Sequence, residues 1–256
     1  MAKTKTIENW APWLLLAGLL ALWQLVTMAF RIDEFVFPSP VATFRSLVDN
    51  FAAIRDHAIQ TFLTTMAGFA IGVVVGLGLG LVLGSSRFVY KAAYPMLVGF
   101  NSIPKAAFVP ILVVWFGIGT VPAVLTAFLI SFFPIVVNVA TGLATLEPEL
   151  EDVLRSLGAT RLDVLLKVGL PRSLPYFFAS LKVAITLAFV GSVVSETVAS
   201  NEGIGYLMMA AGSSMRMSLV FAGLIVISVM AMVMYEVFAL LERRMTGWAH
   251  RGQQAQ

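Results

Sequence analysis

Cysteine is absent from this chain, and few other residues in it are equipped for chemistry. Among its 256 residues there are only two histidines, His57 and His250, far apart in the sequence. Without cysteine the chain has no disulfide, no thiolate nucleophile and no Cys-ligated metal. A metal site built on histidine is also poorly supported.

Charged residues are scarce too. They make up 12% of the chain, against 59% hydrophobic residues, and the mean hydropathy is +0.90. A soluble domain carries roughly 25% charged residues. Such a chain offers too little polar surface to water, so we predict an integral membrane protein in contact with the lipid bilayer. The net charge of +3 is small, and we do not interpret it as nucleic-acid binding.

Six apolar runs are long enough to cross a bilayer, which takes about 20 residues. The first is too long for a secretory signal peptide, and no small-x-small cleavage site follows it. The sequence therefore predicts an all-α membrane protein with six transmembrane helices, at about 12–28, 61–84, 95–117, 123–141, 176–194 and 218–241.

Loop charges predict the orientation of these spans. With the amino terminus inside, eleven of the seventeen Lys and Arg residues lie inside and four outside, while Lys105 and Lys182 lie within spans. Because positive charge favours the cytoplasmic side, both termini are expected in the cytoplasm. We divide the chain into 1–60, with an FPSP turn and a surface helix at about 41–55, a core of 61–244, and a basic and polar tail of 245–256.

The second apolar run contains a glycine at every fourth position. This repeat builds a flat helix face that another helix can approach closely. A phosphate-binding loop is rejected, because no Gly-Lys-Ser/Thr follows and the segment is a span. We predict helix packing for Gly68, Gly72, Gly76, Gly80 and Gly84.

A polar segment at 145–175 interrupts the apolar runs and falls on the cytoplasmic side. Its leucines have helical spacing, with a break at Gly158. Glycine suits a helix end, because it readily adopts the left-handed backbone conformation that stops a helix. Thr160 and Asp163 predict a cap for a second helix, and Pro171 and Pro175 are expected to end that helix. We predict two short amphipathic helices meeting at a glycine elbow, rather than a plain connector.

This segment also carries a resemblance. Asp152-Val153-Leu154, Gly158 and Val168-Gly169-Leu170-Pro171 resemble the EAA loop of bacterial ABC-importer permeases, which reads Glu-Ala-Ala, three residues, Gly, nine residues, Ile-x-Leu-Pro. The spacing matches throughout, with Asp for Glu, Val-Leu for Ala-Ala and Val for Ile. The runs 103–119, 132–138 and 202–207 resemble the branch that imports taurine, sulfonates, nitrate, riboflavin and thiamine or pyrimidine precursors.

The resemblance implies a type I ABC importer permease fold in the bacterial inner membrane. It implies a cytoplasmic ABC ATPase dimer, a periplasmic solute-binding protein and a second copy of this chain as partners. The chain itself would be no enzyme and hold no cofactor, with ATP-Mg bound by the ATPase. The solute would be a heterocyclic or pyrimidine-type organic molecule, or sulfonate, taurine or nitrate. The ATPase-coupling residues implied are Glu151, Asp152, Val153, Leu154, Ser156, Leu157, Gly158, Ala159, Leu170 and Pro171.

Polar residues inside the spans are candidates for the solute path, because charge is costly there. Lys105 either faces that path or caps carbonyls freed by the nearby prolines, while Lys182 is expected to reach the inner interface. The path candidates are Asn101, Ser102, Lys105, Asn138, Ser192 and Ser195, and the candidates for docking the binding protein are Glu196, Asn201 and Glu202.

Two other functional classes remain open. A secondary transporter or channel would need paired intramembrane charges or a repeat, and no clear repeat is present. An intramembrane enzyme would need a nucleophile–base pair or a metal set. ATP dependence of uptake separates the first class from an ABC importer.

Overall fold

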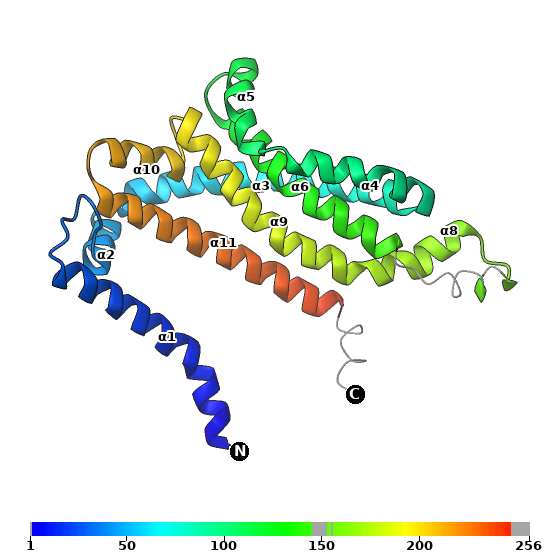
Figure 1. The fold of residues 1–256 in the computed structure, drawn as a ribbon, viewed down its shortest axis with the longest axis horizontal. Helices are drawn as coiled ribbons and strands as arrows, with labels where there is room; N and C mark the ends of the chain where they lie inside the picture. The colour runs from blue at the N-terminus through cyan, green and yellow to red at the C-terminus, as the bar shows by residue number, and fades with distance from the viewer. Residues whose placement is uncertain (1, 145–152, 155, 247–256) are drawn as a thin grey trace.

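The described residues form helices and no strand (Figure 1). A computed structural model describes residues 2–144, 153–154 and 156–246. Five helices are long and apolar enough to span a membrane, and a bent pair makes a sixth, as predicted. The single spans are α1 (Ala2–Ala29), α3 (Phe51–Gly84), α6 (Thr120–Ala144), α9 (Leu170–Ala199) and α11 (Met217–Met245). In the pair, α4 (Arg87–Ser102) is followed by a 3-10 turn, η1 (Lys105–Phe108), and α5 (Val109–Phe116), and the segments Phe88–Ser102 and Lys105–Phe116 are bent by 69°.

Two helix boundaries differ from the prediction. The surface helix expected at about 41–55 is α2 (Pro40–Asp49), and the residues after Asn50 are the first turns of α3. Asn50 ends α2 because its side-chain amide donates to the Ser46 carbonyl at 2.9 Å. The helix expected to begin at about residue 95 also starts earlier, since α4 already begins at Arg87.

The centre of the bundle is the packing of α3, α6 and α9. All five glycines of the α3 repeat face α6, where a methyl group on Gly68 would lie 2.5 Å from the Val124 carbonyl oxygen. Gly191 likewise brings α9 close to α6, since a methyl group on Gly191 would lie 2.8 Å from the Ala127 Cα. The three backbones therefore approach closely around a buried core that includes Ala127, Ile135, Val139, Ala184, Ile185, Ala188 and Phe189.

An aromatic cluster joins α1 to the rest of the chain. The Trp23 indole donates to the Pro38 carbonyl at 3.1 Å and packs on Phe37, and both rings contact Phe221 of α11. Ser39 then caps α2, with Pro40 as its first residue, because proline fits a first helical turn and a serine oxygen satisfies a free amide. The FPSP turn therefore sets both the contact with α1 and the start of α2.

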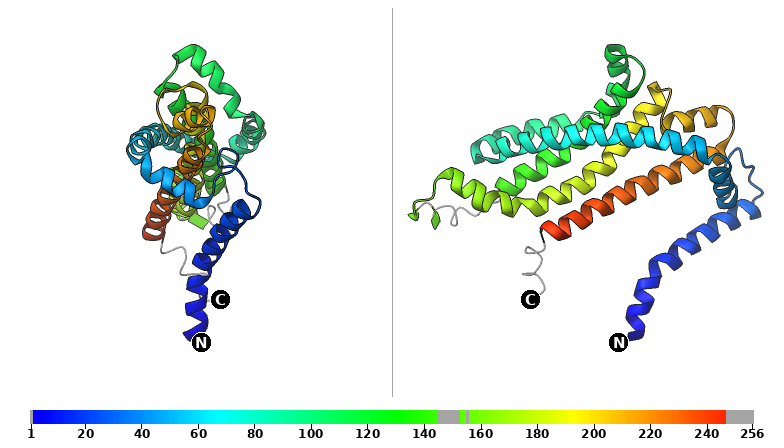
Figure 2. Two further views of the ribbon diagram at one scale, coloured as in Figure 1. Left: turned by 90° about the vertical axis from the view of Figure 1, so that its left-hand side faces the viewer. Right: turned by 180° about the vertical axis from the view of Figure 1, so that it is seen from behind.

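The two ends of the bundle carry different short helices. Helices α2 and α10 (Ile204–Ser213) lie at one end, and α8 (Arg161–Val164) lies at the other (Figures 1 and 2). The loop charges assign the α8 end to the cytoplasm. The α10 end is accordingly the outer one.

Candidate functional site

The glycine elbow of the cytoplasmic segment has the expected backbone. Gly158 has a φ of +90°, and the Ala159 amide donates to the Leu154 carbonyl at 3.0 Å. This six-to-one bond is typical of a Schellman helix end, in which glycine adopts the left-handed conformation. The predicted residues Glu151 and Asp152 lie outside the described residues.

A reciprocal cap starts the second half of the elbow. The Asp163 amide donates to the Thr160 hydroxyl, and the Thr160 amide donates to the Asp163 carboxylate, both at 3.2 Å. Lys167 pairs with the same carboxylate at 2.7 Å. The hydrogen bonds from Lys167 and Thr160 lower the pKa of Asp163 to about 2. The direction of the chain after Gly158 is thus fixed by local bonds.

The chain beyond this cap corrects one prediction. Pro171 and Pro175 do not end the helix, since α8 continues through a π turn (η2, Leu165–Gly169) into α9, which contains both prolines. A π turn shifts the hydrogen-bond register, and Pro171 in the first turn of α9 needs no amide. The cytoplasmic segment and the fifth span therefore form one continuous helical rod.

Apolar side chains on the elbow point outward. Val153 is 56% exposed and Leu157 79% exposed, although the segment lies outside the spans. Apolar groups left exposed beyond the membrane are typical of a protein-binding surface. Of the other predicted residues, Ser156 bonds back to the Val153 carbonyl, while Leu170 and Pro171 are half-buried at the start of α9.

Lys105 lies at the break between α4 and α5. Its ammonium donates to the carbonyl oxygen of Asn101 at 2.7 Å and to the side-chain oxygen of Asn101 at 2.6 Å. The extended backbone at Ile103 ends α4, so the side chain of Lys105 satisfies a carbonyl that its own amide would bond in an unbroken helix. The carbonyl is freed by the helix break rather than by a missing proline amide, so both interpretations of Lys105 stay predictions. Asn101 and Ser102 are exposed beside it.

Of the other predicted path residues, Asn138 is half-buried, and Ser192 and Ser195 are buried. The Asn138 amide donates to the Pro134 carbonyl of its own helix at 2.8 Å. Ser192 and Ser195 are buried in α9, and neither hydroxyl has a hydrogen-bond partner among the described residues, so within one chain they line no open path. Their positions are better explained by close packing, because serine is among the small residues that let membrane helices approach.

Two charged residues also differ from expectation. Lys182 does not simply extend to the interface but pairs with Glu242 of α11 at 2.6 Å. Glu196 does not lie on the outer surface as a docking residue would, because it is 2% exposed. Asn201 and Glu202 are exposed in the turn between α9 and α10, so the outer surface there includes these two residues.

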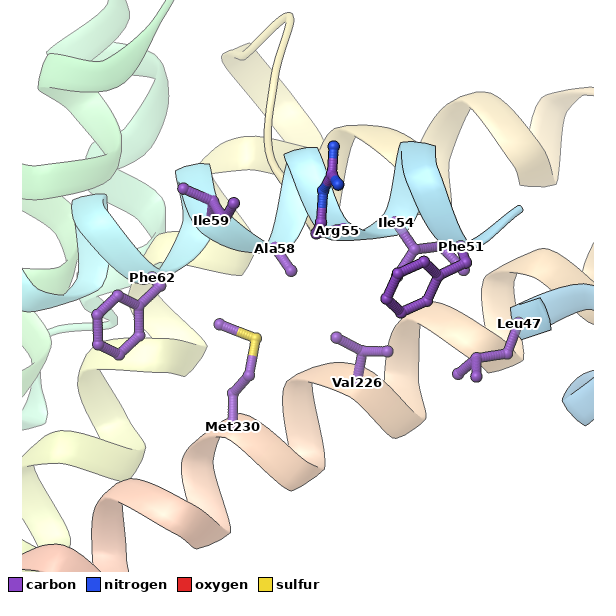
Figure 3. A pocket seen from close by; sticks show the side chains of 9 residues that line it. All are labelled: Leu47, Phe51, Ile54, Arg55, Ala58, Ile59, Phe62, Val226 and Met230. Carbon is purple, nitrogen blue, oxygen red and sulfur yellow. The ribbon is translucent and has the colours of Figure 1, made fainter. Parts of the chain in front are cut away.

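An apolar groove of about 360 Å³ opens between α3 and α11 near the outer end (Figure 3). Its one charged residue, Arg55, turns its guanidinium away and bonds Asp56. A polar solute would find no hydrogen-bond partner in such a lining. The groove is formed by Leu47, Phe51, Ile54, Arg55, Ala58, Ile59, Phe62, Val226 and Met230.

These features define a multi-pass membrane protein with a cytoplasmic elbow that exposes an apolar surface. Residues 68–247 match the family described as binding-protein-dependent transport system inner membrane component, and the chain belongs to this family. It is therefore the transmembrane subunit of an ABC importer in the inner membrane, a class that works with an ATPase and a binding protein.

Known relatives cover nearly the whole chain. A probable ABC transporter permease from Haemophilus influenzae is 34% identical over 88% of this chain and 91% of its own length. A formylaminopyrimidine transport permease from Halalkalibacterium halodurans is 29% identical over 93% of this chain and 95% of its own length. The MetNI methionine ABC transporter in an inward-facing form shares the fold, with a TM-score of 0.68 at 19% identity, over 77% of this chain and 98% of that one.

Proposed function

We propose that two copies of this chain form a pore for a small solute that a periplasmic binding protein delivers. Each elbow, residues 153–169, sits in one subunit of a cytoplasmic ATPase dimer that binds ATP-Mg and carries out all of the hydrolysis. ATP closes the dimer and opens the pore outward, and hydrolysis returns it inward. The chain itself holds no cofactor.

The observation that carries this proposal is the construction of the elbow. Val153 and Leu157 are exposed on a turn that Gly158 and the Thr160–Asp163 cap hold in one conformation. A flexible connector would need neither. Because α8 continues into α9, force applied to the elbow acts directly on a helix at the centre of the bundle.

The proposed second copy is supported by polar side chains that stay exposed at the break between α4 and α5, although each makes a hydrogen bond within its own chain. Asn101 and Ser102 are exposed beside Lys105 at the break between α4 and α5. Polar side chains in lipid are costly and usually face a protein interior or a water-filled cavity. We therefore place the solute path between two copies, along this break.

The solute class is proposed from relatives of the same branch. Their names refer to formylaminopyrimidine, aliphatic sulfonates, taurine, riboflavin and nitrate. We favour a small heterocyclic or pyrimidine-type organic solute, with a sulfonate, taurine or nitrate as the next candidates. Screening the binding protein for ligands decides among these.

The decisive experiment is a mild-detergent pull-down of the tagged chain from its native membrane, followed by reconstitution. We expect an ATPase to co-purify and uptake to require ATP. Recovery of the chain alone, in a preparation that transports without ATP, would instead favour a secondary transporter or channel.

Gly158→Asp tests the elbow itself. A side chain at a φ of +90° is strained, so we expect this variant to insert normally but to lose uptake per ATP hydrolysed. Gly117→Asp is the matched control, since Gly117 also has a positive φ of 78° and open space around it, but lies at the outer end of α5. Normal solute uptake in Gly158→Asp would refute the coupling role of the elbow.

A further inference from the structure

A buried carboxyl group lies at the outer end of the bundle, far from the elbow. Glu196 of α9 is 2% exposed, and its Oε2 accepts hydrogen bonds from the Thr61 hydroxyl at 2.8 Å and the Gly205 amide at 3.0 Å. Its Oε1 accepts a third from the Thr64 hydroxyl at 3.3 Å. One side chain thereby joins α9, α3 and α10.

Three consecutive amides at the start of α10 are bonded by side chains from outside the helix. The amides of Gly203, Ile204 and Gly205 donate in turn to His57 Nδ1 at 3.1 Å, Thr61 Oγ1 at 2.8 Å and Glu196 Oε2 at 3.0 Å. First-turn amides have no partner within their own helix, and α10 has no side-chain cap of its own. We call His57, Thr61 and Glu196 the outer cap network.

Two glycines make this approach possible. Gly203 has a φ of +99°, and a methyl group there would collide with the Glu196 carboxyl group. A methyl group on Gly205 would lie 2.5 Å from the Val193 carbonyl oxygen and 2.7 Å from the Glu196 Cβ. The Gly-Ile-Gly sequence therefore allows the start of α10 to close directly onto α9.

The same helix that carries Glu196 begins at the elbow. From Arg161 to Ala199 the helix is continuous through its π turn, which gives a rod of roughly 58 Å at about 1.5 Å per residue. The outer cap network lies near one end of this rod and the Gly158 elbow at the other. The outer cap network is thus a set of hydrogen bonds through which a movement of the elbow can reach α10, in addition to the packing of α10 on α9 and α11.

We propose that Glu196 is a positioning residue that fixes α10 to this rod and to α3, so that the outer surface moves together with the cytoplasmic elbow. The inference rests on the proposed function, because it assumes that the binding protein docks on the outer surface and the ATPase on the elbow. The group acts by accepting hydrogen bonds, and a neutral side chain of the same shape can replace it.

Two pairs of variants test this role. Thr61→Val removes both the donor to Glu196 and the acceptor for the Ile204 amide, while Thr65→Val makes the same change one turn along α3. Thr65 is equally buried, and its hydroxyl has no partner in the described part of the chain. Glu196→Leu removes the acceptor, while Glu196→Gln retains an oxygen for Thr61 and Gly205 and an amide for Thr64.

The network is measured first without any partner. Hydrogen–deuterium exchange of peptides covering 200–207, on the full chain in lipid nanodiscs, reports the three amides directly. We expect exchange at least about tenfold faster in Thr61→Val and Glu196→Leu, since each variant removes two or more hydrogen bonds. Thr65→Val and Glu196→Gln should exchange within about twofold of the unmodified chain. If these amides exchanged equally fast in Thr61→Val and Thr65→Val, the outer cap network would not protect them, and the proposal would be overturned.

Coupling is measured next in vesicles that contain the co-purified ATPase, with the co-purified binding protein added as isolated. We expect Thr61→Val and Glu196→Leu to keep ATPase association but lose about tenfold in stimulation of hydrolysis by the binding protein. Full stimulation in both variants, despite faster exchange, would refute the positioning role. A Glu196→Gln variant as defective as Glu196→Leu would refute the hydrogen-bonding account.

The two readouts separate this proposal from the proposed function. If the unmodified assembly shows no ATP-dependent uptake, the importer assignment of partners fails, whatever the exchange rates are. If uptake is normal and only the exchange contrast is missing, the network alone fails. Should Glu196→Leu not reach the membrane, the two threonine variants still decide the question.

Discussion

The glycine face of α3 allows a sharp test, because one glycine of the same helix lies outside it. A methyl group on Gly68 would lie 2.5 Å from the Val124 carbonyl oxygen and 2.6 Å from the Ala127 Cβ, whereas one on Gly78 would meet nothing within 4 Å. We therefore compare Gly68→Ala with Gly78→Ala. Both replacements gain the same helix propensity, so the difference between them isolates the collision with α6.

The size of the effect can be worked out from the distances. Non-bonded carbon atoms settle about 3.5–4.0 Å apart, so α6 must move by about 1 Å to admit the new methyl group at residue 68. Overpacking of this kind costs about 1–3 kcal/mol. The unfolding equilibrium constants of the two variants should therefore differ by roughly 5- to 150-fold, with Gly68→Ala the less stable and Gly78→Ala at least as stable as the unmodified chain.

The assay is reversible unfolding of the purified chain in mild detergent, for example by steric trapping. Retained membrane insertion of both variants is the control, since insertion depends on hydropathy rather than on packing. Equal stability of the two variants would show that α3 and α6 do not approach as closely as their backbones indicate. A more stable Gly68→Ala would refute the packing argument outright.

Two further predictions concern ion pairs. Hydrogen bonds from Lys167 and Thr160 lower the pKa of Asp163 to about 2, whereas an unfolded aspartate titrates near 3.9. The stability that Asp163 gives to the elbow is therefore complete above about pH 4 and is lost as the pH falls towards 2. A ¹³C titration of its carboxyl group tests this, and a midpoint near 4 would contradict it. Breaking the half-buried Lys182–Glu242 pair with Lys182→Met should cost about 1–3 kcal/mol by leaving a carboxylate unpaired. Adding Glu242→Gln should recover most of that loss, and thermal unfolding of both variants would show whether it does.

Features with a short-range cause could be predicted from the sequence. The apolar runs, the Gly158 elbow and the Thr160–Asp163 cap each depend on residues within a few positions, and all three are present. The four-residue glycine repeat predicted a flat face on α3, because such spacing keeps residues on one side of a helix. Which helix covers that face depends on the fold, and only the structure identifies α6.

Features with a long-range cause could not be predicted. Glu196 finds its partners on Thr61, which is 135 residues away, and on Gly205 across a turn. Lys182 and Glu242 are separated by 60 residues. One signal was nonetheless available for Glu196, namely the polar Thr61, Thr64 and Thr65 at the start of an apolar run, since polar groups buried in a membrane need partners of their own kind.

The prediction that prolines end the second helix of the cytoplasmic segment was wrong for a different reason. Pro171 and Pro175 indicate a helix end, because each removes an amide and restricts the preceding residue. A π turn placed directly before Leu170 and Pro171 changes which carbonyl is left free, and that adjustment has no local sequence signature. The continuous helix from the elbow to Ala199, on which the proposed coupling depends, could therefore not be predicted from the sequence.

The hydrogen bonds within the spans bear on where solute selectivity resides. Hydrocarbon offers no hydrogen bonds, so a polar group in a span is costly unless it finds a partner in the protein. Lys105 bonds Asn101, Asn138 bonds the Pro134 carbonyl, and Glu196 bonds the start of α10. These groups already serve the fold of one chain. The Ser102 hydroxyl also donates to a carbonyl of its own helix, that of Val98, but its side chain stays exposed. Recognition of a polar solute would therefore depend on such exposed groups, enclosed by a second copy, together with the binding protein.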